Sequence, residues 1–76
     1  MHEQSQDLKE LLLQTDEEFH QLAAKHHELD DRLHELTAKT YLSEPEQVEE
    51  VNLKKRKLYI KDRMETIIRQ ARAVTA

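Results

Sequence analysis

The chain has 76 residues, enough for one small domain, which as a lone monomer would remove only a modest fraction of its surface from water. It contains no cysteine, no glycine and one proline, which excludes disulfides and thiolate metal sites and argues against β-hairpins and barrels. Sixteen acidic side chains and twelve Lys or Arg give a net charge of −4, and residues with high helix propensity dominate the composition. We therefore expect a single all-α domain spanning residues 1–76.

No apolar run approaches the length of a membrane span, the longest being Leu11 to Leu13. The first residues, Met1 to Gln4, are polar and acidic and do not resemble a secretory signal. We expect a cytoplasmic protein without a membrane segment.

Two capping boxes divide the chain into helices predicted near residues 5–14, 16–38 and 44–73. In the first box Thr15 precedes Glu18 by three residues, and in the second Ser43 precedes Glu46 in the same way, with a proline between them. The hydrophobic pattern runs straight through Thr15. The sequence therefore leaves open whether the first helix ends there or only bends.

The segment that includes the second helix carries an unbroken heptad seam, with positions spaced alternately four and three residues apart. This spacing is typical of a left-handed coiled coil. The seam positions are Leu8, Leu12, Thr15, Phe19, Leu22, His26, Leu29, Leu33 and Leu36.

The predicted third helix has apolar side chains on two faces, which indicates two neighbours. One stripe consists of Leu53, Ile60, Met64, Ile67, Ala71 and Val74, and Val51 and Leu58 lie roughly opposite it. We expect the first stripe to pack inside the chain and Val51, Leu58 and Tyr59 to contact another chain. The predicted fold is an antiparallel, coiled-coil-like helical hairpin that associates into a homodimer or a larger helical bundle. Its predicted core is Phe19, Leu22, His26, Leu29, Leu33, Leu36, Leu53, Ile60, Met64 and Ile67.

Charge is divided unequally along the chain. Residues 1–50 hold 14 acidic and 4 Lys or Arg side chains, whereas residues 51–76 hold 2 and 8. An acidic helix folded back on a basic one is self-complementary, although each surface pair contributes only about 0–1 kcal/mol. Antiparallel pairing would bring Leu36 near Val48, Leu33 near Val51, and Asp30 near Lys54 or Lys55. We expect a charge network of Asp30, Lys54, Lys55, Lys61 and Asp62.

Two short motifs in the second and third helices resemble the YdcH-like family of small bacterial proteins. They read Phe19-x-x-Leu22-x-x-x-His26-x-x-Leu29-Asp30-x-x-Leu33 and Leu53-Lys54-Lys55-x-Lys57-Leu58-x-x-Lys61-Asp62-x-Met64. The resemblance extends from about Leu8 to Ile68. It implies a coiled-coil-forming helical hairpin of no established biochemical function, and it implies no catalytic residues.

The histidines offer two hypotheses. His20, His27 and His34 recur every seven residues, too far apart along one helix to share a metal ion, so we expect no metal or cofactor. His26 occupies the seam itself. We expect it to be half-buried and hydrogen-bonded across the hairpin, which would set register; the alternative is a pH switch.

Catalysis finds little support in the sequence. There is no phosphate loop, nucleophile elbow or zinc-protease motif, and a helical hairpin offers little room for a deep pocket. We expect a non-enzymatic protein–protein interaction or adaptor module that binds a second copy of itself. Another helical protein is the alternative partner. The alternative function is nucleic-acid association through the basic run from Lys54 to Lys57. The acidic net charge and the lack of stacking aromatic side chains other than Tyr59 count against that alternative.

Overall fold

The computed structural model describes the backbone of residues 2–75 and the side chains of residues 7–74. The remainder of the predicted 1–76 domain, and the side chains of the acidic N-terminal stretch, lie outside the described residues. The described backbone forms three helices and no strand: α1 (His2–Thr15), α2 (Glu17–Thr37) and α3 (Glu44–Thr75). The prediction of an all-α fold is confirmed.

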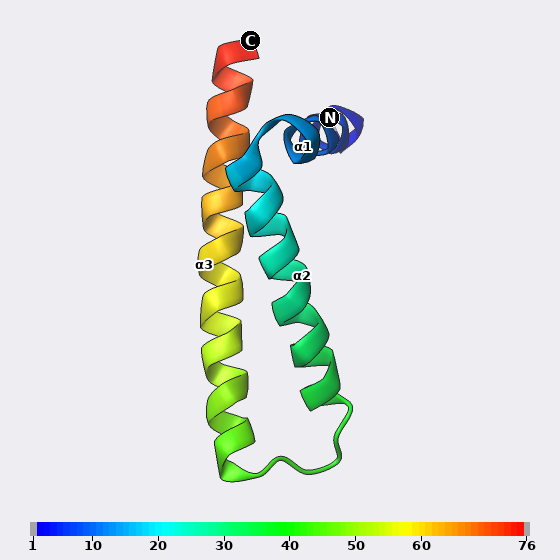
Figure 1. Cartoon of the computed structure of the whole chain (residues 1–76), viewed down its shortest axis with the longest axis vertical. Helices are drawn as coiled ribbons and strands as arrows, with labels where there is room; N and C mark the ends of the chain where they lie inside the picture. Colours follow the sequence, from blue (N-terminus) through cyan, green and yellow to red (C-terminus); the bar gives the residue numbers. More distant parts are fainter. Residues whose placement is uncertain (1, 76) are drawn as a thin grey trace.

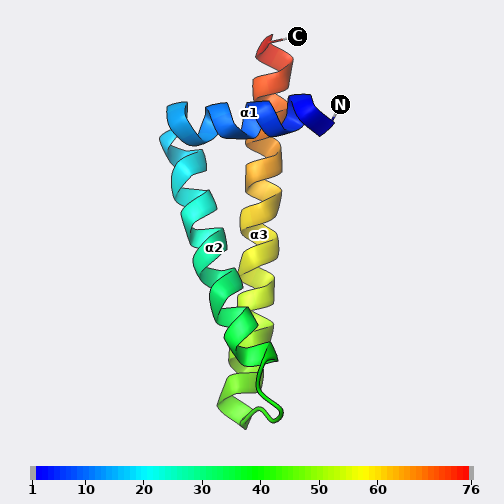
Figure 2. The ribbon, with the colours of Figure 1, turned by 90° about the vertical axis from the view of Figure 1, so that its right-hand side faces the viewer.

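The helices α2 and α3 run antiparallel, side by side, and form a hairpin closed by the loop at residues 38–43 (Figure 1). The helix α1 turns away from α2 and lies across the open end of this hairpin (Figure 2). The molecule is consequently elongated, with principal extents of 48 × 20 × 18 Å. The C-terminal turns of α3 extend beyond the level of α1.

The elbow between α1 and α2 is a true helix break. Asp16 has an extended backbone (φ −113°, ψ 110°), and its Oδ1 accepts a hydrogen bond of 2.9 Å from the Phe19 N–H. Asp16 is therefore the N-cap of α2, and the prediction that Thr15 is the cap is wrong. The Thr15 hydroxyl instead donates to the Leu11 carbonyl at 2.8 Å and belongs to the last turn of α1.

The second capping box is confirmed at the start of α3. The Glu46 N–H donates to the Ser43 hydroxyl oxygen at 3.3 Å, and Glu46 Oε1 accepts from both the N–H and the hydroxyl of Ser43 at 3.0 Å. Lys39 from the other end of the loop also donates to the Glu46 carboxylate. The Lys39 ammonium and the Ser43 donors together lower the pKa of Glu46 from 4.5 to about 2. The loop closes with no residue at positive φ among those described, so a chain without glycine can make this turn.

The apolar core is divided into two clusters along the hairpin. The cluster nearer the loop consists of Leu29, Leu33, Leu36, Leu53 and Ile60, with Leu42 packed against it. The cluster nearer the elbow consists of Leu12, Phe19, Ile67 and Ile68. Leu22 and Met64 are half-buried and contact both clusters. Of the predicted stripe, Leu53, Ile60 and Ile67 are buried. Ala71 is half-buried like Met64, and Val74 is 86% exposed on the turns of α3 that extend beyond the hairpin.

Among the described residues, three ion pairs join α2 to α3. Arg32 donates from Nε and Nη2 to the Glu49 carboxylate at 2.7 and 2.9 Å, and Arg63 does the same to Glu18 at 2.9 and 3.1 Å. The third pair joins Lys57 to Asp30. Arg32 lowers the pKa of Glu49, and Lys57 lowers the pKa of Asp30, in each case chiefly through the direct hydrogen bond.

Two residues expected near α2 across the hairpin do not belong to the buried core. Val48 and Val51 were expected beside Leu36 and Leu33, but they are 59% and 51% exposed. Leu53 occupies the inward position instead. The reason is the rotation of α3 about its own axis, which turns the face containing Leu53 inward and the two valines outward.

No helix among the described residues is long and apolar enough to cross a membrane.

Candidate interaction surface

The outward face of α3 carries a stripe of exposed apolar side chains. Val48, Val51 and Leu58 are spaced three and seven residues apart and therefore share one helix face, and Tyr59 lies beside Leu58. The exposed fractions of Val51, Leu58 and Tyr59 are 51%, 61% and 72%. We call Val48, Val51, Leu58 and Tyr59 the outer stripe. It lies opposite the inward side chains Leu53 and Ile60, because Val51 and Leu58 each precede one of them by two residues, which is about half a turn of helix.

No comparable stripe occurs on the other helix of the hairpin. Among the described residues, α2 has no exposed large hydrophobic side chain, whereas α1 exposes Leu11 and Leu13 and the loop exposes Tyr41. The two leucines lie in the last turns of α1 and are therefore close to the elbow at Asp16. The outer stripe is thus the longest run of exposed apolar side chains along one described helix.

An apolar hollow of about 420 Å³ adjoins the outer stripe on the side where α3 meets α2. Tyr59 forms one wall, and Leu29 and Ile60 form the floor. The remaining lining consists of Lys25, Lys55 and Arg56, whose alkyl stems can cover apolar surface while the charged ends stay in water. The hollow has the character of a site for an apolar or aromatic side chain.

The predicted charge network is wrong, because no two of its members form an ion pair with each other among the described residues. Asp30 pairs with Lys57, not with Lys54 or Lys55, because Lys57 is the lysine turned toward α2. Lys54 lies 3.9 Å from Glu50 on its own helix. Lys55, Lys61 and Asp62 are exposed and form no ion pair within the described residues.

His26 is half-buried, at the seam position expected for it, but it has no hydrogen bond to another described residue. The predicted hydrogen bond across the hairpin is therefore wrong. His26 instead lines a hollow of about 350 Å³ where α1 crosses the hairpin, together with Met64 and Ile68 and with the charged residues Lys9, Lys57, Lys61 and Glu65. A smaller hollow beside it is lined by Lys9, Glu65, Ile68, Arg69 and Arg72.

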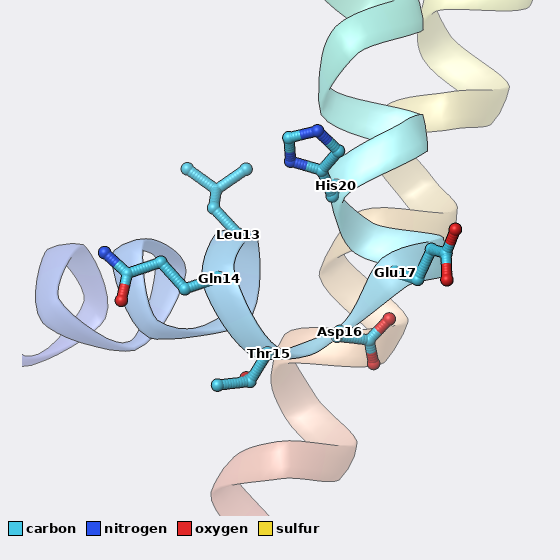
Figure 3. A pocket seen from close by; sticks show the side chains of 6 residues that line it. All are labelled: Leu13, Gln14, Thr15, Asp16, Glu17 and His20. Carbon is cyan, nitrogen blue, oxygen red and sulfur yellow. The ribbon is translucent and has the colours of Figure 1, made fainter.

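The other histidines whose side chains are described, His20, His27 and His34, lie on exposed faces. His27 is 3.4 Å from Asp31, and His34 is 3.8 Å from Asp30, each pair being one turn apart on α2. His20 lines a hollow of about 440 Å³ at the elbow, where its side chain and that of Leu13 project on the same side (Figure 3). Within the described part of the chain, no three His, Cys, Asp or Glu side chains come together as a metal site would need.

Several structural residues escaped the sequence analysis, among them Ile68, Arg32 and Glu49. Ile68 is buried under α1, although only its spacing of four from Met64 could have indicated this. Arg32 and Glu49 form a bidentate pair, as Arg63 and Glu18 do, and the charge pattern alone could not select it because eight acidic side chains lie in residues 28–50.

The fold and this surface define an all-α helical-hairpin protein with an exposed apolar helix face. The chain matches the model of the family described as "Protein of unknown function (DUF465)" over residues 19–68, two thirds of its length, and it belongs to that family. This is the YdcH-like family, so the resemblance drawn from the two motifs is confirmed. The match includes nearly all of the hairpin and begins after α1. No curated protein and no solved structure matches the chain significantly.

Proposed function

We propose that this protein is a non-enzymatic, self-associating interaction module that uses the outer stripe of α3. The observation that carries the proposal is the second apolar face of α3, which lies opposite the packed core and remains exposed in the single chain. A helix with two apolar faces normally has two neighbours, and α2 occupies only one of them. A protein of this size also gains stability from oligomerisation.

The proposed adaptor role uses the same surface. An amphipathic helix of another protein, with apolar residues at matching three- and four-residue spacing, can replace the second copy on the outer stripe. Self-association and partner binding would then compete. No catalytic step is assigned to the chain in this proposal.

The decisive experiment is sedimentation velocity of the wild-type protein and of Leu58→Asp over a wide concentration range. We expect the wild type to form dimers or larger bundles and the variant to sediment as a monomer with unchanged helical circular dichroism. Ala24→Asp is the matched control, because Ala24 is exposed on α2, away from the stripe. A wild type that stays monomeric at all concentrations, or a variant that keeps the wild-type mass, contradicts the proposal.

A second candidate function is nucleic-acid association, which two hollows favour. Five basic residues gather around them on the side where α1 crosses α3, together with one acidic residue, Glu65; the basic ones are Lys9, Lys57, Lys61, Arg69 and Arg72. Phosphate contacts release counterions, so binding of mixed-sequence DNA or RNA would weaken steeply as salt rises. Lys61→Glu would reduce such binding more than the control Lys25→Glu on α2, and absence of binding at low salt would dispose of this function.

A further inference from the structure

Two unpaired charges of opposite sign flank the centre of the outer stripe. Lys55 and Asp62 are exposed and form no ion pair within the described residues. They are seven residues apart, which is about two turns, so they lie on the same face of α3. Leu58 and Tyr59 lie midway between them. The stripe thus presents a positive charge, an apolar centre and a negative charge in order along the helix.

This order distinguishes between the two ways in which copies of α3 can pair. In a parallel two-fold dimer each residue faces its own counterpart, so Lys55 would meet the partner's Lys55 and Asp62 the partner's Asp62. Like charges held together at an interface are unfavourable. In an antiparallel two-fold dimer centred between Leu58 and Tyr59, Lys55 meets the partner's Asp62, and the reciprocal contact forms by symmetry.

We infer that two copies of this chain pair through the outer stripes of antiparallel α3 helices, with Lys55 bound to the partner's Asp62 on both sides of an apolar centre. The inference rests on the proposed self-association and specifies its geometry. A second copy is the occupant because the pattern is complementary to itself in this one orientation. The helix α2 takes part only at the hollow beside Tyr59, through Lys25 and Leu29, so the hairpin core need not rearrange.

The hollow beside Tyr59 fits this arrangement. A two-fold axis next to Leu58 and Tyr59 brings the partner's Tyr59 to the side of α3 on which the hollow opens. Its floor of Leu29 and Ile60 is apolar, and aromatic rings contribute much of the energy of compact interfaces. The contact includes only a few turns of each helix, and small interfaces are commonly weak or transient. We therefore expect a dimer that dissociates on dilution.

Charge reversal tests the geometry. Lys55→Glu and Asp62→Lys each place like charges at both reciprocal contacts, and each is expected to raise the dimer Kd about tenfold or more. The double variant restores opposite charges and should return the Kd to within about threefold of the wild type. In a parallel dimer the single and double variants would all stay near the wild-type Kd, because each residue would still face its own counterpart.

Cysteine cross-linking supplies an independent readout, since the chain has no cysteine of its own. An antiparallel pair centred between Leu58 and Tyr59 brings Val51 opposite the partner's Thr66. A mixture of Val51→Cys and Thr66→Cys should therefore form a disulfide-linked heterodimer, whereas Val51→Cys alone should not cross-link. Efficient cross-linking of Val51→Cys to itself would overturn the antiparallel arrangement.

The outcomes separate this inference from the proposal on which it rests. A wild type that is monomeric at all concentrations overturns both. Suppose that Leu58→Asp abolishes self-association, but that the double variant with Lys55→Glu and Asp62→Lys does not recover the wild-type dimer Kd. That result overturns only the antiparallel pairing.

Discussion

Arg32 of α2 binds Glu49 of α3 through two parallel hydrogen bonds, from Nε at 2.7 Å and from Nη2 at 2.9 Å. The Arg32 guanidinium also donates to Glu35, one turn away on its own helix, at 2.8 Å. The cross-helix pair lies between the two long helices near the loop, where it selects one rotation of α3 over others. Its planar geometry is specific to arginine, because a lysine ammonium cannot form the same two-point contact.

We expect Arg32→Lys to lower the melting temperature by at most about 5 °C, because the pair is still partly exposed, with 38% and 36% of the two side chains accessible to water. Glu35→Gln is the control, since it removes only the contact within α2. Thermal denaturation followed by circular dichroism at 222 nm would measure both. A larger effect from the control than from Arg32→Lys would contradict the role given to Glu49.

The core near the loop should be the most sensitive to truncation. Leu36 is fully buried, and Leu36→Ala is expected to reduce the free energy of unfolding by about 2–5 kcal/mol. Val74→Ala, at a position that is 86% exposed, should change it by no more than about 0.5 kcal/mol. Urea denaturation of both variants measures the difference, and similar values would show that Leu36 is not a core residue.

The elbow provides a test of which residue caps α2. Asp16→Ala removes the acceptor of the Phe19 N–H and should cost about 1 kcal/mol of stability. Thr15→Ala removes only a hydroxyl bonded to a carbonyl within α1, so its effect should be smaller. Amide exchange at Phe19 should accelerate in the first variant and not in the second. The opposite ranking would restore Thr15 as the cap.

Acid should weaken the loop contacts of Glu46. Its pKa falls from 4.5 to about 2 in the folded chain, through Lys39 and then Ser43, so the stabilisation is complete above about pH 4.5. It is lost as the pH falls toward 2. The lowered pKa values of Asp30 and Glu49 add to the loss of stability in acid.

We therefore expect the melting temperature of the wild type to fall between about pH 4.5 and pH 2, and Glu46→Gln to reduce the size of that fall. The variant should also melt at a lower temperature than the wild type at pH 7. Glu44→Gln is the matched control, because it removes the same charge at the first residue of α3. It leaves the contacts of Glu46 with Lys39 and Ser43 in place. If Glu44→Gln reduces the acid-induced fall in melting temperature as much as Glu46→Gln does, the reduction comes from the charge of the first turn alone.

The sequence predicted the inward side of α2 well, because regular three- and four-residue spacing places side chains on one face regardless of what packs there. Phe19, Leu29, Leu33 and Leu36 are all buried. The direction of α1 could not be predicted in this way. The seam continues through Thr15, and only the backbone angles of one residue, Asp16, turn α1 across the hairpin.

The surface of α3 was predictable only in part. Its two apolar faces follow from spacing, and Leu53, Ile60 and Ile67 are buried while Val51 and Leu58 are exposed. Which lysine meets Asp30 depends on the rotation of α3 by a fraction of a turn, and several lysines lie within that range. Exposure of the outer stripe is visible in the structure, but its use in self-association remains a proposal.

The division of the core gives the hairpin an uneven resistance to opening along its length. The cluster near the loop is built by α2 and α3 alone, with Leu42 from the connection, whereas the cluster near the elbow needs Leu12 of α1. Release of α1 would uncover Ile67 and Ile68 without disturbing Leu36 or Leu53. The hairpin should therefore open first at the elbow, while the end near the loop stays closed. In native-state hydrogen exchange, backbone amides near the elbow should exchange before those near the loop.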